Sequence, residues 1–122
     1  PKHFIENGRS ISDYDPSDWF FERVVFIDIQ VSTEELIRPS HISGSLAPGS
    51  TPDALLIRTG FEAKRGKTEY WESNPGISEE LAIFIRRNFP SIKLIGFDFI
   101  SASSFKNREE GRRAHLALLG TE

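Results

Sequence analysis

Few side chains in this sequence can do chemistry near neutral pH. The 122 residues include three histidines, His3, His41 and His115, and no cysteine. Without cysteine, disulfides, thiolate nucleophiles and cysteine-ligated zinc sites are excluded. The sequence also contains no G-x-S-x-G nucleophile elbow and no glycine-rich phosphate loop. Chemistry must therefore draw on the histidines together with carboxylates, as acids, bases or metal ligands.

Each histidine has a functional and a structural interpretation. His115 follows Gly111 by one helical turn, and the glycine is expected to leave open space beside the imidazole for a ligand or a metal. The alternative is a partly buried helix histidine with a satisfied hydrogen bond. His41 lies in a segment rich in Ser, Pro and Gly and is expected to be solvated. His3 lies near the first residue, where a chain end is more often frayed than functional.

Two apolar runs and one amphipathic segment predict the elements that must position these side chains. Residues 23–31 and 92–100 are dense in β-branched and aromatic residues and are predicted to be buried strands. Residues 54–57 predict a shorter strand that ends at Thr59-Gly60. Residues 78–89 predict a helix. The order strand, helix, strand indicates a crossover unit with parallel pairing.

The helix ends are marked by capping signals. Ser78 is expected to cap the helix over residues 78–89, and Pro90 ends it. A last helix is predicted from Asn107 to at least Leu119, with the Asn107 side chain as cap and Glu110 in the capping-box position.

The segment between the first two predicted strands contains residues that interrupt regular structure. Residues 32–37 are expected to open a short helical turn that Pro39 stops. Residues 39–52 are mostly Ser, Gly and Pro, and they predict a long surface loop that buries little apolar surface.

Composition limits the class of protein. With 38% apolar residues the chain is long enough for one core, and we expect a single domain over residues 1–122. The net charge of -3 argues against nucleic acid as a partner. No apolar run is long enough for a membrane span, so no membrane partner is expected and a cytoplasmic location is the default. The first residue is a proline and methionine is absent, so the chain is expected to be incomplete.

Five short segments, taken in order, resemble the cyclase family, which includes kynurenine formamidase. Pro1-Lys2-His3-Phe4 is similar to the end of that family's metal signature, H-x-G-T-H-x-D-x-P-x-H, with the last histidine at His3. The other four segments resemble, in order, an apolar strand, an "lLiRTG" strand and turn, a G-[IFL]-D-x-x-S segment and a histidine-bearing helix of the family. Here they read VVFID (24–28), LLIRTG (55–60), IGFDFIS (95–101) and AHLALL (114–119).

The resemblance implies an α/β fold of the swivelling β/β/α type, with a mixed sheet and flanking helices, present here as an incomplete portion. It implies a hydrolase of carbon–nitrogen bonds in N-formyl or cyclic amides, a Zn²⁺ or Mn²⁺ cofactor and a homo-oligomer. His115 would be a metal ligand, and His3 would be the general acid/base that assists a metal-activated water as nucleophile. The remaining ligands would precede Pro1 and follow Glu122. The alternative, from another class, is a non-catalytic interaction or scaffold homologue that retains the fold without the metal centre.

Other candidate residues have two interpretations each. Ser103 replaces an aspartate of many family members, which argues against kynurenine formamidase itself. Trp71 and residues 19–21 (Trp-Phe-Phe) could line an aromatic substrate pocket or serve as core or interface. Arg58 could bind a substrate carboxylate or form a structural ion pair. Asp98 could support a metal site from outside its ligand shell or cap a turn.

Overall fold

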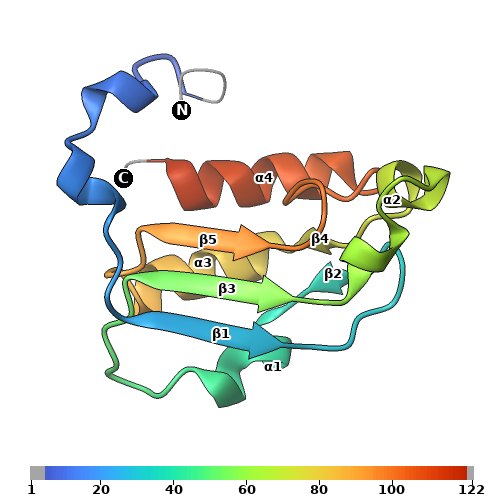
Figure 1. Cartoon of the computed structure of the whole chain (residues 1–122), viewed down its shortest axis with the longest axis horizontal. Coiled ribbons are helices and arrows are strands. Elements are labelled where there is room, and N and C mark those ends of the chain that lie inside the picture. Colours follow the sequence, from blue (N-terminus) through green and yellow to red (C-terminus); the bar gives the residue numbers. More distant parts are fainter. Residues whose placement is uncertain (1–4, 121–122) are drawn as a thin grey trace.

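Two parallel sheets form the framework of the computed structural model, which describes residues 5–120. The larger sheet has the order β1-β3-β5, with β1 (Val24–Asp28), β3 (Ala54–Arg58) and β5 (Leu94–Phe97) all parallel (Figure 1). The smaller sheet pairs β2 (Leu36–Ile37) with β4 (Gly76–Ile77), again in parallel. The predicted α/β class and parallel crossover are confirmed. The outer strands are shorter than the apolar runs that predict them.

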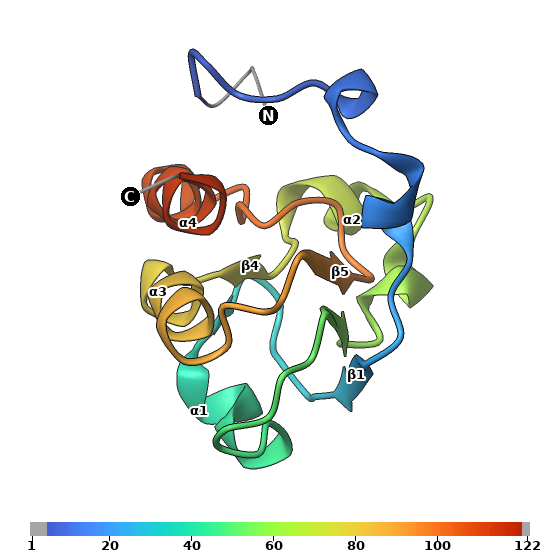
Figure 2. The same cartoon turned by 90° about the vertical axis from the view of Figure 1, so that its left-hand side faces the viewer.

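Three helices cover one face of the larger sheet. The helices of residues 5–120 are α1 (Pro39–Ile42), α2 (Thr68–Glu72), α3 (Glu79–Asn88) and α4 (Arg108–Leu119), and short 3-10 turns lie at Ile11–Asp13, Pro16–Trp19, Ser43–Ser45 and Phe61–Lys64. Viewed along the strands, α1, α3 and α4 lie on the same side of β1, β3 and β5 (Figure 2). The path from β3 to β5 passes through α3, as a parallel pair requires.

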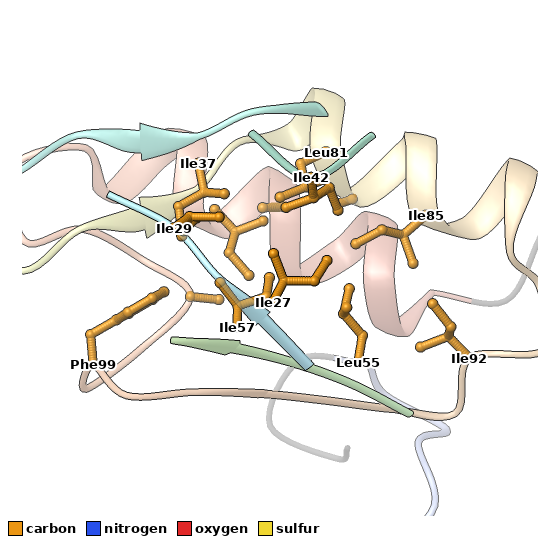
Figure 3. Packing of buried hydrophobic residues seen from close by; sticks show 14 of the residues in the cluster. Ile27, Ile29, Ile37, Ile42, Leu55, Ile57, Leu81, Ile85, Ile92 and Phe99 are labelled. Atoms are coloured by element: carbon orange, nitrogen blue, oxygen red, sulfur yellow. The ribbon is translucent and has the colours of Figure 1, made fainter. Parts of the chain in front are cut away.

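The core lies between this sheet face and α3. Ile27 and Leu55 point from the strands toward Leu81 and Ile85 of the helix, and all four are at most 3% exposed (Figure 3). Full burial of such a side chain is worth about 1.5–3 kcal/mol. Successive strand residues point to opposite faces, which explains why Phe26, next to Ile27, is 60% exposed.

Helix α3 begins and ends as predicted. The Ser78 hydroxyl accepts a hydrogen bond from the Leu81 N–H at 3.1 Å, and Phe89 is the C-cap residue, directly before Pro90. Glu79 and Glu80 lie in the first turn, and Arg86 and Arg87 lie in the last. These charges complement the helix dipole.

The start of α4 differs from its prediction. Asn107 is the cap residue, but its side chain makes no capping hydrogen bond. Glu110 does not close a capping box; its Oε1 accepts the backbone N–H of Glu79 at 2.9 Å. Because α3 and α4 pack together, Glu110 satisfies one of the donors that α3 leaves unpaired at its start. This bond, followed by contacts with Arg113, holds the pKa of Glu110 below its usual value.

Two predictions for residues 32–52 are wrong. Glu34 has a φ of 65°, in the left-handed region, so residues 32–35 form a turn and residues 36–37 become strand β2. Residues 39–52 contain α1, and Ile42 and Leu46 are 0% and 3% exposed. Pro39 occupies the first helical turn, where its missing N–H is not needed. The segment therefore contributes to the core.

Candidate active site around His115

The imidazole of His115 is held against the backbone of its own helix, α4. Its Nδ1 lies 2.8 Å from the carbonyl oxygen of Gly111 and 3.4 Å from the Ser103 hydroxyl. A carbonyl oxygen only accepts, so Nδ1 carries the proton. In the neutral ring the lone pair is then on Nε2, the atom that would coordinate a metal. The ring is half-buried.

The open space expected beside His115 is filled. A Cβ on Gly111 would lie 2.3–2.5 Å from the Oγ, Cβ and Cα of Ser103, so the loop that carries Ser103 sits directly on the helix backbone. The expectation of open space at this glycine is therefore wrong. The absence of a side chain at Gly111 lets the loop that carries Ser103 pack against the helix, and the Ser103 hydroxyl lies near Nδ1 of His115.

Replacing Gly111 with alanine should destabilise the protein although alanine is the better helix former. Alanine gains about 1 kcal/mol of helix propensity over glycine. The new methyl group overlaps Ser103, and overpacking costs about 1–3 kcal/mol, more where backbone must move. We expect a lower urea midpoint for Gly111→Ala. Gly44→Ala is the control, since nothing lies within 4 Å of its added Cβ. Equal stability of Gly111→Ala and the parent would contradict this packing.

His41 is bound rather than solvated, contrary to expectation. Its Nδ1 accepts the backbone N–H of Arg38 at 2.9 Å, and its Nε2 lies 3.2 Å from Glu35 Oε1. The lone pair of Nδ1 is thus used by the backbone and Nε2–H faces a carboxylate. His41 has a structural role at the start of α1.

Asp98 follows β5 and caps the turn after β3. Its carboxylate accepts bonds from the N–H and hydroxyl of Thr59 and from the N–H of Gly60, at 2.7–3.0 Å. Gly60 has a φ of 79°, which glycine adopts without strain. Arg58, the residue before Thr59, pairs with Asp28 and Glu62 at 3.3 Å each. These contacts support a turn-capping role for Asp98 and a structural ion pair for Arg58.

A pocket of about 310 Å³ lies beside His115, between α3, α4 and β5. Its floor includes the buried side chains of Ile85, Ile92 and Ala102. Arg86 and Lys93 are exposed at its edge, and neither makes an ion pair with any residue of the described range. The pocket therefore combines an apolar floor, a histidine and two cations.

The aromatic candidates do not line this pocket. Trp71 is 55% exposed and borders a separate hollow with Asn74, Ser103 and Phe105. Trp19 and Phe20 are 47% and 79% exposed.

Asn74 is a residue of this region that the sequence does not single out. An asparagine before Pro75-Gly76 has the appearance of a turn residue, and no local pattern indicates that it is buried.

The described residues supply one candidate metal ligand. Within residues 5–120 no group of three or more His, Cys, Asp or Glu side chains is placed to hold a metal ion. His115 is the ligand that the resemblance implies, but a catalytic zinc takes three protein ligands. His3, the general acid/base that the resemblance implies, lies outside the described residues. No helix in the described part of the chain is long and apolar enough to cross a membrane.

The fold and this site define an α/β protein whose candidate chemistry is centred on a helix histidine. A family model confirms the resemblance: the Cyclase family, described as "putative cyclase", matches residues 1–104. The match covers more than half of the chain, and the chain belongs to the cyclase family. The family indicates an enzyme and is metal-dependent in general. No curated protein matches the sequence. His115 lies beyond the matched residues.

Proposed function

We propose that the protein is a metal-dependent hydrolase of carbon–nitrogen bonds in N-formyl or cyclic amides. In this proposal His115 is a metal ligand through Nε2, and His3 is the general acid/base. The observation that carries the proposal is the bond from His115 Nδ1 to the Gly111 carbonyl. Metal-ligating histidines characteristically donate their other ring N–H to a carbonyl or carboxylate in this way, which fixes the tautomer and the ring orientation.

A bound Zn²⁺ or Mn²⁺ would supply Lewis acidity and lower the pKa of a coordinated water towards ~7. The contribution of the chain is to hold His115 in its metal-binding tautomer and to present an apolar surface beside it. The pocket of about 310 Å³ suits a small amide with an apolar body, and its size is near the lower limit for ligand sites. His3 would protonate the departing nitrogen.

The test uses the full-length product of the natural reading frame. We expect Zn²⁺ or Mn²⁺ to copurify with it, measured by elemental analysis, and N-formylkynurenine or a member of a cyclic amide panel to be hydrolysed. A chelator should abolish the activity, and added metal should restore it. A folded full-length protein that holds neither metal and hydrolyses none of these substrates would instead support the non-catalytic homologue.

A further inference from the structure

A buried side-chain amide fixes the loop that touches His115. Asn74, in the segment before β4, is 1% exposed. Its Nδ2 donates to the carbonyls of Pro75 and Ser103, each at 2.9 Å, and its Oδ1 accepts the Phe105 N–H at 3.1 Å. The two donated bonds and the accepted bond agree on a single orientation of the amide. Asn74 therefore ties residues 103 and 105 to the start of β4.

The same loop limits where the imidazole can go. Ser103 is pressed against Gly111, where a Cβ would overlap its Oγ, Cβ and Cα, and its Oγ lies 3.4 Å from His115 Nδ1. The Gly111 carbonyl accepts from the same nitrogen at 2.8 Å. Nδ1 thus lies within hydrogen-bonding distance of both a helix carbonyl and a loop hydroxyl. The helix fixes one of these groups, and Asn74 holds the loop that carries the other.

We propose that Asn74 is a positioning residue for His115. By holding Ser103 against Gly111, it restricts the imidazole to the orientation in which Nδ1–H faces the carbonyl and Nε2 carries the lone pair. Only the consequence for metal binding rests on the proposed function. The positioning is a property of the metal-free chain.

Measuring the tautomer of His115 distinguishes a positioning role of Asn74 from a purely structural role. Nitrogen NMR of the ¹⁵N-labelled chain, with a chelator present at pH 8, distinguishes Nδ1–H from Nε2–H rings. Single His→Gln variants assign the three histidines. We expect the parent chain to show the Nδ1–H form of His115. In Asn74→Ala the ratio of Nδ1–H to Nε2–H should fall by about three- to tenfold, as expected for weakening of one hydrogen bond.

Two further variants complete the test. Ser103→Ala removes only the hydroxyl and should shift the ratio in the same direction by a smaller factor. Ser78→Ala removes the cap of α3 and lowers stability without removing a hydrogen bond of Asn74 or Ser103, so it should leave the ratio unchanged. An unchanged ratio in folded Asn74→Ala, or an equal change in Ser78→Ala, overturns the proposal. If Asn74→Ala does not fold, an unchanged ratio in Ser103→Ala overturns it. None of these outcomes depends on metal or on hydrolysis, so a failure here is distinguishable from failure of the proposed function.

Discussion

In the full-length protein, His115→Gln is expected to lower kcat/KM for amide hydrolysis by more than about 100-fold. Loss of an outer partner of a metal ligand typically costs about 10–100-fold in affinity or activity, and loss of the ligand itself should exceed that range. Glutamine keeps a similar length and polarity but lacks the imidazole lone pair. Metal content measured by elemental analysis should fall together with activity.

The matched control for this variant is His41→Gln. His41 is also a half-buried histidine, but both of its ring nitrogens are engaged by Arg38 and Glu35. We expect its loss to lower stability by about 1 kcal/mol and to leave activity and metal content within a factor of about two. Full activity and full metal content in folded His115→Gln would contradict the assignment of His115 as a ligand.

The elements that periodicity and capping define were predictable from the sequence. Residues 78–89 combine an apolar face with Ser78 and Pro90 at their ends, and the structure places α3 there. Local sequence patterns did not predict the structure where contacts between distant segments determine it. Pairing with β4 makes residues 36–37 a strand, and Glu79 draws Glu110 away from its own helix start. Both contacts join residues more than 30 positions apart.

The candidate site was predictable only in part, for the same physical reason. Resemblance selects His115, and its position on a helix follows from the sequence pattern. The neighbours that define its chemistry are not local: Ser103 arrives from the loop after β5, and Asn74 from the segment before β4. Gly111 illustrates the difficulty. A helix glycine indicates a close approach, but the sequence does not say whether a ligand or a loop makes it.

Asp98→Ala is expected to destabilise the protein by about 2–4 kcal/mol. The variant leaves the N–H and hydroxyl of Thr59 and the N–H of Gly60 without their acceptor. An unsatisfied buried donor costs about 1–3 kcal/mol, and Thr59 is 9% exposed, whereas Gly60 can turn to water. Urea unfolding of the 122-residue chain measures the change as a lower midpoint at an unchanged slope.

Asp28→Ala is the matched control, because Asp28 is also at a strand end but forms an exposed ion pair with Arg58. Such pairs contribute about 0–1 kcal/mol. A loss for Asp98→Ala no larger than that for Asp28→Ala would contradict the capping role.

The acid limb of the stability curve provides a second measurement on Asp98. Burial alone would raise the pKa of this carboxyl, but the hydrogen bonds that it accepts from Thr59 and Gly60 outweigh burial and hold the pKa below its usual 3.8. A carboxyl whose folded-state pKa is depressed stabilises the fold above its unfolded pKa of about 3.9. That contribution is lost as the pH falls through the lower, folded-state value. Between about pH 5 and pH 2 the parent should therefore lose more stability than Asp98→Ala, and the two urea midpoints should converge. Parallel curves over this range would show that the Asp98 carboxylate does not stabilise the turn through its charge.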